Sequence, residues 1–582
     1  MKKITGIIVF SLIFASLVCT GCAKKIESIY HTVPEWQARY NSPLDDNRNQ
    51  EITDGKYDKK LAVKCINGTF VGRKNDGVIS WKGIPYAQQP IGELRFKEAQ
   101  PPVASDKTYE AYYFGSTSMQ PWDAMEMASQ YHQGEDNLTL AIYKNASNKN
   151  KNNPVLVYIH GGGWVQGGMS DPLYDGWNFV HYNPDVILVT ITYRTGLLGL
   201  INFDCGNLFE DADEFKLSKN NGLLDQTAAL KWIKNNIAGF GGNPDNVTIA
   251  GESAGGGAVS SLCLVKEAKG LFNKVLAMSG GINQYVSLES STKLAKKLAK
   301  DFNCKSVKEL QKIPFDELSE WWVNNLNLIN FCIRDGMTVP EDPFSAWKTD
   351  VGTDISFMQG ATTNEFAYYR LVFGNDALYE KFCEAMAYVL SHGEDKAGGS
   401  YDNYVNVLKK MGFTDEKDIF IEVGNDYSLQ MTNYYQATAH AKNGGKEFIY
   451  AFDQNYDYRP DVLKAAHAVD CSYLFGNFDG KYALGTPEEV EFSRKFQQMV
   501  TNFCKNGNPS LKDLEWKQYD PKNGSCMELS SKNCEMTDKY QERIDAYVNL
   551  MENVEMARYV QSWDYLFGII ATLPGSAEVL GK

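Results

Sequence analysis

The sequence predicts an α/β fold, in which a mostly parallel central sheet is covered by helices on both faces. Residues 155–159 and 186–191 are short apolar runs rich in β-branched side chains, which is typical of strands buried on both faces. Residues 225–237 place apolar side chains at helical spacing, and Gly239 follows as a stop signal. Strands that alternate with helices form parallel sheets, which hold their functional groups at the carboxyl ends of the strands.

Further strands are expected at residues 246–250, 274–278, 355–359 and 448–452, with a helix ending near Val265. The 582 residues, 43% of them hydrophobic and 13% aromatic, can fill a large core, and α/β folds with loop and helix insertions reach this length as one unit. The lack of an internal repeat argues against a solenoid or propeller. We predict one main domain over residues 59–540 and a helical tail over residues 541–582 that packs on it.

The amino terminus has the pattern of an export signal. Lys2 and Lys3 precede an apolar run over residues 4–18 that is too short to span a bilayer comfortably. Residues 20–22 (Thr-Gly-Cys) look like the lipobox of a bacterial lipoprotein, so residues 1–22 are expected to be a signal peptide and Cys22 the lipidated residue. Polar residues 23–58 would form a tether. We expect the protein to lie outside the cytoplasm, attached to a membrane only by this lipid. Secretion as a soluble protein is the alternative, because Cys19 stands where an aliphatic residue is usual.

Charge and cysteine content exclude two classes of function. A formal net charge of −14 leaves no basic surplus to neutralise phosphates, so a nucleic-acid partner is not expected. Ten further cysteines are scattered from Cys65 to Cys534 without the paired spacing of a zinc site, so no metal is expected. Cys526 and Cys534 are the only close pair in the carboxyl-terminal region. Export would permit disulfides, but buried free thiols are an equally good interpretation for most of the ten.

Residues 251–255 (Gly-Glu-Ser-Ala-Gly) match the G-x-S-x-G nucleophile elbow of α/β-hydrolase folds, and they lie between a predicted strand and a predicted helix, as that motif requires. A strand that turns sharply into a helix strains the backbone of the central serine and crowds its neighbours, so the flanking glycines have a physical reason. Ser253 is therefore the candidate nucleophile. The five-residue pattern alone is weak, because small residues also cluster in ordinary turns.

A second glycine-rich segment follows the strand at residues 155–159. Residues 160–164 (His-Gly-Gly-Gly-Trp) would let the main chain approach a substrate closely, and backbone N–H groups are suitable donors for the oxyanion of ester cleavage. The alternatives are a flexible turn or a phosphate loop. No Lys-Ser/Thr pair follows, which excludes a Walker-type loop.

Seven histidines are available as the general base. The chain order of the fold, serine then acid then histidine, leaves only His392, His440 and His467. His392 lies in a polar stretch that reads as a loop. His440 lies on an apparent helix, where a histidine is more often packed or exposed than catalytic. His467 precedes an apolar helical run at a loop-to-helix position, which favours it as the base.

Several further motifs resemble the type-B carboxylesterase family, which includes bacterial para-nitrobenzyl esterases, vertebrate carboxylesterases and cholinesterases. The resemblance runs from about residue 60 to about residue 535. The motifs occur in family order at residues 83–87 (Gly-Ile-Pro-Tyr-Ala), 92–96 (Gly-Glu-Leu-Arg-Phe), 135–140 (Glu-Asp-Asn-Leu-Thr-Leu), 193–194 (Tyr-Arg), 221–226 (Asn-Gly-Leu-Leu-Asp-Gln), 240–243 (Phe-Gly-Gly-Asn), 278–280 (Met-Ser-Gly) and 507–509 (Gly-Asn-Pro).

The resemblance implies roles for individual residues. Glu365, in residues 360–365 (Gly-Ala-Thr-Thr-Asn-Glu), would be the acid, and His467 fills the family's histidine position. The oxyanion hole would consist of the N–H groups of three residues, Gly162, Gly163 and Ala254. Glu252 and Ser279, from the elbow and from the 278–280 motif, would support the site, and Arg95 and Glu135 would form a structural ion pair.

Two positions depart from the family pattern. A cysteine upstream of residues 135–140 often pairs with one inside that segment, whereas Met119 and Asn137 stand at these places, so that disulfide is absent. Phe366 follows the acid where glycine is common, which should alter local packing and leave the carboxylate available.

The leading hypothesis is a serine ester hydrolase that forms an acyl-enzyme and requires neither a metal nor an organic cofactor. Its base must be neutral, so activity should fall as the pH drops through a histidine pKa on the order of 6–7. One alternative is a catalytically dead adhesion module, which this family also includes. Another keeps the chemistry and changes the substrate from a small-molecule ester to polysaccharide-linked acyl groups or to amides.

Overall fold

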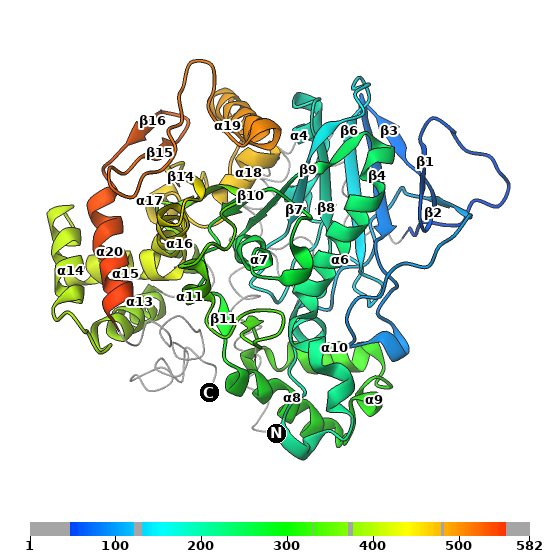
Figure 1. The fold of residues 1–582 in the computed structure, drawn as a ribbon, viewed down its shortest axis with the longest axis horizontal. Coiled ribbons are helices and arrows are strands. Elements are labelled where there is room, and N and C mark those ends of the chain that lie inside the picture. Colours follow the sequence, from blue (N-terminus) through cyan, green and yellow to red (C-terminus); the bar gives the residue numbers. More distant parts are fainter. Residues whose placement is uncertain (1–46, 122–130, 329, 371–375, 479–481, 555–582) are drawn as a thin grey trace.

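The computed structural model describes residues 47–121, 131–328, 330–370, 376–478 and 482–554, and an 11-stranded mixed sheet forms its centre. The seven middle strands are parallel, and antiparallel strands complete both edges (Figure 1). The predicted α/β fold class is confirmed. From edge to edge the strands are β16 (Cys534–Thr537), β15 (Cys526–Leu529), β14 (Lys446–Phe452), β13 (Ser356–Thr362), β10 (Lys274–Met278), β9 (Gly242–Glu252), β7 (Asn153–Ile159), β8 (Ile187–Ile191), β6 (Thr139–Asn145), β4 (Val78–Pro85) and β3 (Arg73–Asn75).

The middle strands are buried on both faces, as their apolar runs predicted. Val155, Val157 and Ile159 of β7 join one hydrophobic core, and Leu156 and Tyr158 join a second core on the opposite face of the sheet. Successive side chains of a strand point to opposite faces, so one continuous apolar run serves both cores.

Helices cover each face. The first core includes side chains of α6 (Asn221–Asn236), α7 (Ala254–Leu262) and α16 (Met431–Lys442), and the second includes those of α4 (Trp177–Tyr182), α18 (Val469–Phe475) and α19 (Pro487–Asn506). The predicted helix over residues 225–237 is α6, which begins four residues earlier, at Asn221.

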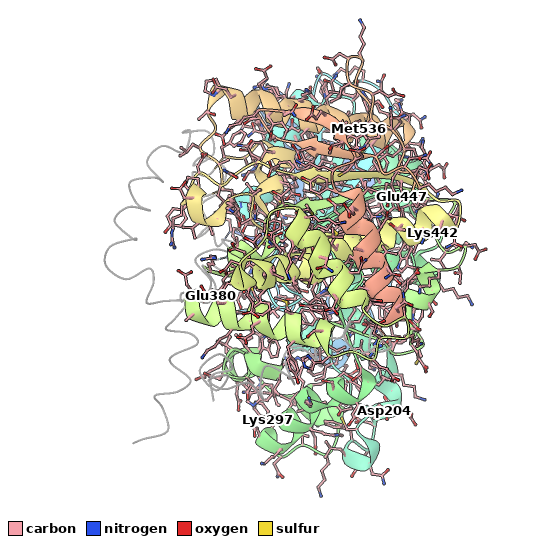
Figure 2. The ribbon with its side chains drawn as sticks, turned by 90° about the vertical axis from the view of Figure 1, so that its left-hand side faces the viewer. Asp204, Lys297, Glu380, Lys442, Glu447 and Met536 are labelled. Carbon is pink, nitrogen blue, oxygen red and sulfur yellow. The ribbon has the colours of Figure 1, made fainter. Side chains whose placement is uncertain are left out.

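The helix insertions form a third core beside the carboxyl edge of the sheet. It includes side chains of α8 (Leu288–Phe302), α9 (Val307–Leu310) and α10 (Phe315–Val323), which gather at one end of the molecule (Figure 1). Figure 2 shows Asp204 and Lys297 at this end and Met536 of β16 at the other. The other strands and α-helices of the described residues, together with one π-helix, are β1 (Ala62–Cys65), β2 (Gly68–Val71), β5 (Thr108–Glu110), α5 (Gly196–Gly199), β11 (Tyr285–Val286), β12 (Cys332–Ile333), α11 (Pro343–Trp347), α13 (Asp376–Ser391), α14 (Ser400–Lys410), α15 (Glu416–Asn425), the π-helix Asp426–Gln430, α17 (Pro460–Leu463) and α20 (Gln541–Asn553).

The register of the parallel strands brings the predicted site segments to one edge. Ile159 at the end of β7 is paired with Gly251 of β9, and Gly251 is paired with Ala277 of β10. Met278 is in turn paired with Gly360 of β13. The loops that follow these four strands therefore leave the sheet side by side.

Both ends of the described chain are attached to the domain. The side-chain oxygen of Asn49 accepts hydrogen bonds from the N–H groups of Tyr112 and Tyr113, and its amide donates to the carbonyl oxygens of Lys82 and Tyr113. The last part of the predicted tether thus contacts the domain. At the other end, Arg543 of α20 is buried and ion-paired with Glu422 and Asp426. The predicted signal peptide, Cys22, tether residues 23–46 and tail residues 555–582 lie outside the described residues.

No helix in the described part of the chain combines the length and the apolar character needed to span a bilayer. The ten cysteines in this part carry free thiols. Cys526 and Cys534 lie on neighbouring strands, but they face Thr537 and Leu529 rather than each other.

Candidate active site

Ser253 occupies a strained turn between β9 and α7, with φ 59° and ψ −122°. The flanking glycines are required by close backbone approach. A Cβ on Gly251 would lie 2.4 Å from the carbonyl carbon of Gly255, and a Cβ on Gly255 would lie 2.1 Å from the carbonyl oxygen of Ile159. The Ser253 N–H donates to the carbonyl oxygen of Met278 at 2.9 Å. The segment thus has the geometry of a nucleophile elbow, and such strain persists only where surrounding contacts hold it.

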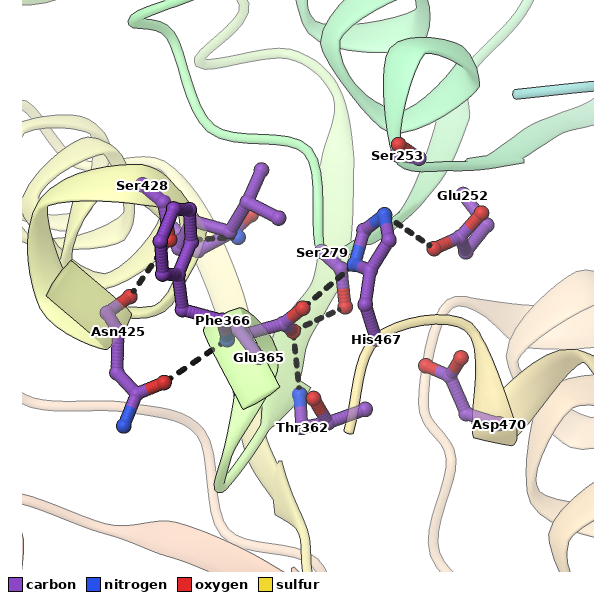
Figure 3. A network of polar contacts seen from close by, with 12 residues as sticks. Glu252, Ser253, Ser279, Thr362, Glu365, Phe366, Asn425, Ser428, His467 and Asp470 are labelled. Atoms are coloured by element: carbon purple, nitrogen blue, oxygen red, sulfur yellow. Dashed lines mark hydrogen bonds and ion pairs between the residues drawn. The ribbon is translucent and has the colours of Figure 1, made fainter. Parts of the chain in front are cut away.

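His467 lies two residues before the start of α18 and is buried. Its Nδ1 is 2.6 Å from Oε2 of Glu365, and its backbone N–H donates to the carbonyl oxygen of Glu365 at 3.3 Å. The opposite ring nitrogen, Nε2, faces the side on which Ser253 lies (Figure 3). The three predicted triad residues are therefore brought together from loops that are distant in sequence.

Glu365 follows β13 and is fully buried. Its second oxygen, Oε1, accepts hydrogen bonds from the N–H of Thr362 at 2.7 Å and from the hydroxyl of Ser279 at 2.5 Å. Both carboxylate oxygens are thus engaged, which fixes the orientation of the carboxylate toward the ring of His467 (Figure 3).

Phe366 turns its side chain away from this contact. Its N–H donates to Oδ1 of Asn425 at 2.8 Å, which attaches the segment after the acid to the end of α15. Phe366 stands where the resemblance led us to expect glycine, and its side chain joins an aromatic cluster. The Glu365 carboxylate still contacts His467. The ring of Phe366 stacks on Tyr369, Tyr379 and Phe382.

Glu252 adds a second carboxylate beside the histidine, because its Oε1 lies 3.1 Å from Nε2 of His467. Burial alone would lower the pKa of His467, but the negative charges of Glu252 and Glu365 outweigh it and raise that pKa to about 9. This value exceeds the range of 6–7 expected for an ordinary histidine. The sequence shows Glu252 beside the serine but does not show that its side chain faces the ring.

Asp470 is a third buried acid near the histidine, and the sequence leaves it as a rival to Glu365 for the role of the acid. Burial, followed by the charges of Glu252 and Glu365, raises its pKa well above the usual value, which favours the neutral carboxyl. The hydroxyl of Tyr450 lies 3.4 Å from its Oδ2. In the sequence, the signal that Asp470 could lie near the histidine was its position three residues after His467, on the first turn of α18.

The glycine-rich segment after β7 adopts backbone angles that glycine favours. Gly162 and Gly163 have φ of 98° and 62°, and a Cβ on Gly162 would lie 2.3 Å from the carbonyl oxygen of Gln166. Among the described residues, the N–H groups of Gly162 and Gly163 donate no hydrogen bond. Ala254 is the first residue of α7, where a helical N–H has no partner within the helix. These N–H groups suit the predicted oxyanion hole.

The other candidate histidines lie elsewhere. His440 of α16 is fully buried against Glu447, and its Nε2 lies 2.8 Å from the carbonyl oxygen of Gly352. His392 is exposed after α13. His160 stacks on Tyr193, and burial lowers its pKa to about 4.

The predicted ion pair between Arg95 and Glu135 is present, with two contacts of 2.5 and 2.7 Å. The guanidinium also donates to the carbonyl oxygens of Leu310 and Ile313. The pair therefore attaches the segment before β5 to the helix insertion. Met119 and Asn137, at the positions of the absent disulfide, are fully buried.

Comparisons with known proteins agree with this geometry. Residues 59–548 match the carboxylesterase family. The chain is 31% identical over 479 residues to a para-nitrobenzyl esterase of Bacillus subtilis (strain 168), covering 80% of this chain and 94% of that protein. It is 30% identical to liver carboxylesterase 1 of Mus musculus, covering 79% and 88%. Among solved structures, a carboxylesterase of Geobacillus stearothermophilus superposes with a TM-score of 0.73 at 28% identity, covering 84% of this chain and 100% of that one.

Proposed function

Because the chain belongs to the carboxylesterase family and is a serine ester hydrolase, we propose that Ser253 is its nucleophile, His467 its general base and Glu365 the acid that orients the histidine. The observation that carries the proposal is the 2.6 Å contact between Nδ1 of His467 and Oε2 of Glu365, which directs Nε2 to the side of Ser253 (Figure 3). A carboxylate on Nδ1 selects the tautomer whose Nε2 can accept a proton.

The reaction then proceeds in two halves. His467 takes the hydroxyl proton of Ser253 while the oxygen attacks the ester carbonyl carbon, and the resulting oxyanion accepts hydrogen bonds from the N–H groups of Gly162, Gly163 and Ala254. The protonated histidine gives its proton to the leaving alcohol. A water molecule, deprotonated by His467 in turn, attacks the acyl-enzyme and releases the carboxylic acid and Ser253.

Covalent labelling tests this assignment. A fluorophosphonate should modify Ser253, and Ser253→Ala should lose both the label and esterase activity, the latter by roughly three orders of magnitude or more. Mass spectrometry of the labelled peptide and hydrolysis of nitrophenyl esters of graded acyl length provide the readouts. A label on another residue, or sustained hydrolysis by the alanine variant, would refute the role of Ser253. A dead adhesion module would take up no label.

We also propose that the mature enzyme is anchored outside the cytoplasm by a lipid on Cys22, with residues 23–46 as part of the tether. The support is the sequence pattern of residues 1–22, a basic start, a short apolar run and Thr-Gly before the cysteine. Each acyl methylene buried in a membrane contributes about 0.8 kcal/mol, so two or three chains would hold the protein firmly. Full-length protein should incorporate labelled palmitate and partition into detergent, and Cys22→Ala should do neither. Wild-type protein that takes up no label would refute the anchor and leave only export.

A further inference from the structure

Three side chains of the loop between β10 and β11 make hydrogen bonds to other segments, and two of the three contact proposed catalytic residues. Ser279 bonds to Glu365, and the amide of Asn283 donates to the carbonyl oxygens of Tyr427 and Ser428 in the π-helix, both at 2.8 Å. The third side chain, that of Gln284, is buried and extends to the nucleophile elbow. The sequence pattern gives this glutamine no role.

Gln284 joins two segments through the two ends of its amide. Its Oε1 accepts a hydrogen bond from the indole N–H of Trp164 at 2.9 Å, and its Nε2 donates to the carbonyl oxygen of Ser253 at 3.2 Å. Trp164 is fully buried and ends the glycine-rich segment with a positive φ of 64°. One amide thus spans from the residue after Gly163 to the nucleophile itself.

The contact with the Ser253 carbonyl has a geometric consequence. The peptide unit between Ser253 and Ala254 is planar, so its carbonyl and the N–H of Ala254 point in opposite directions and turn together. That carbonyl also accepts the N–H of Gly257 at 2.9 Å. Two donors therefore hold the peptide plane and with it the direction of the Ala254 N–H.

Gly257 shows that the elbow is shaped around this glutamine. A Cβ at position 257 would lie 2.6 Å from Oε1 and 2.9 Å from Cδ of Gln284. The position is inside α7, where glycine costs about 1 kcal/mol relative to alanine, so the absence of a side chain there needs a packing reason. The close approach of the Gln284 amide supplies that reason.

We infer that Gln284 is a positioning residue that sets the two halves of the oxyanion hole relative to each other, Gly162 and Gly163 on one side and Ala254 on the other. The inference rests on the proposed roles of Ser253 and of these N–H groups. The oxyanion forms only in the transition state, so a displaced donor lowers kcat and leaves ground-state binding almost unchanged.

Gln284→Met keeps the length of the side chain and removes both hydrogen bonds. We expect kcat to fall by about 10- to 100-fold while KM changes less than about threefold, because small displacements of catalytic groups have effects of this size. Affinity for an aryl trifluoromethyl ketone, which forms a tetrahedral adduct with the serine, should fall in parallel with kcat. The matched control is Gln497→Met on α19, which removes a buried amide whose oxygen accepts a hydrogen bond from Asn183. This variant should leave kcat unchanged even if the melting temperature drops.

Trp164→Phe supplies a second, milder test, because it removes the indole N–H and keeps an aromatic ring. It should lower kcat by about threefold to tenfold, since one hydrogen bond is lost. In the Gln284→Met background it should add almost nothing, because the connection is already broken. Losses that multiply in the double variant would overturn the inference.

The inference about Gln284 would also be overturned by an unchanged kcat in folded Gln284→Met. If that variant does not fold, an unchanged kcat in Trp164→Phe would overturn it. Fluorophosphonate labelling separates the two levels of the argument. Wild-type enzyme labelled at a residue other than Ser253 would refute the proposed function, whereas wild-type labelled at Ser253 combined with unchanged kcat in these variants would refute only the role of Gln284.

Discussion

Within the described residues, two buried histidines each hold a glutamate at Nδ1 with almost the same geometry. His467 and Glu365 meet at the carboxyl edge of the sheet, and His440 of α16 meets Glu447 of β14; in both pairs Nδ1 lies 2.6 Å from a carboxylate oxygen. Contact distance and burial therefore do not distinguish the pair at the site from the structural pair.

The difference lies at the second ring nitrogen. Nε2 of His440 faces the carbonyl oxygen of Gly352 at 2.8 Å, so both of its nitrogens are used within the core. Nε2 of His467 faces Glu252 and the side of Ser253 instead (Figure 3). A histidine pair becomes useful for proton transfer only when one nitrogen is directed at a nucleophile.

The largest expected contrast comes from replacing each histidine by glutamine. His467→Gln should reduce kcat/KM by roughly three orders of magnitude or more, because no base remains for the serine. His440→Gln should reduce stability by about 1–3 kcal/mol through its lost buried hydrogen bonds and leave kcat within about threefold. Ester hydrolysis and urea unfolding of both variants measure the contrast. Comparable activity losses in the two would contradict it.

Replacing the two glutamates should show the same contrast, with a large loss of activity at Glu365 and almost none at Glu447. Glu365→Gln keeps the shape of the side chain but can select the wrong imidazole tautomer, so kcat should fall by about 100-fold or more with the fold retained. Glu447→Gln changes a carboxylate that also accepts two contacts of 3.0 Å from Gln359, and it should leave kcat nearly unchanged. Single-turnover kinetics with a nitrophenyl ester would report the acylation step directly. If Asp470→Asn mimics Ser253→Ala while Glu365→Gln does not, the assignment of the acid is wrong.

The fold could be predicted in outline because parallel strands buried on both faces produce unbroken apolar runs. Residues 274–278 coincide with β10, whereas the run at residues 246–250 marks only the middle of β9, which extends from Gly242 to Glu252. The extra residues of β9 are polar residues, glycines and one proline, and they carry no strand signal of their own. Gly242 is paired with β7, and Gly251 and Glu252 are paired with β10, so contacts with neighbouring strands order both ends of β9. Short elements such as β11, with two residues, depend on tertiary contacts and leave no periodic pattern.

The site was predictable where a motif constrains the backbone. The elbow glycines and chain order lead to Ser253 and His467, and the resemblance supplies Glu365. The side chains that contact these residues could not be predicted in the same way, because those contacts depend on where segments distant in sequence meet. Glu252 is over two hundred residues from His467 in sequence, and Gln284 reaches Trp164 across 120 residues, so neither contact has a local signal.

The pH profile should sharpen the comparison between the two pairs. The base must be neutral, and the pKa of His467 is about 9, so kcat/KM should decline about tenfold per pH unit below that value. Glu252→Gln removes a charge that raises this pKa, so the midpoint should move toward neutral pH, whereas Glu447→Gln should leave it in place. The free energy of unfolding should change in the opposite direction to activity as the pH rises. Protonated His467 stabilises the folded state fully below the unfolded pKa of about 6.5, and this stabilisation is lost as the pH rises through about 9. Profiles with a neutral nitrophenyl ester provide the measurement, and an unmoved midpoint in Glu252→Gln would contradict the assignment of the charge.

The smallest expected effect concerns the donors that hold each acid. Ser279→Ala removes one hydrogen bond from Oε1 of Glu365, but the N–H of Thr362 still donates to the same oxygen and His467 still contacts the other. A net hydrogen bond contributes about 0.5–1.5 kcal/mol, which corresponds to a fall in kcat of about twofold to tenfold with KM unchanged. Gln359→Met makes the corresponding change at Glu447 and should alter only the free energy of unfolding. A Ser279→Ala enzyme as impaired as Glu365→Gln would mean that the serine, rather than the Thr362 N–H, determines where the carboxylate points.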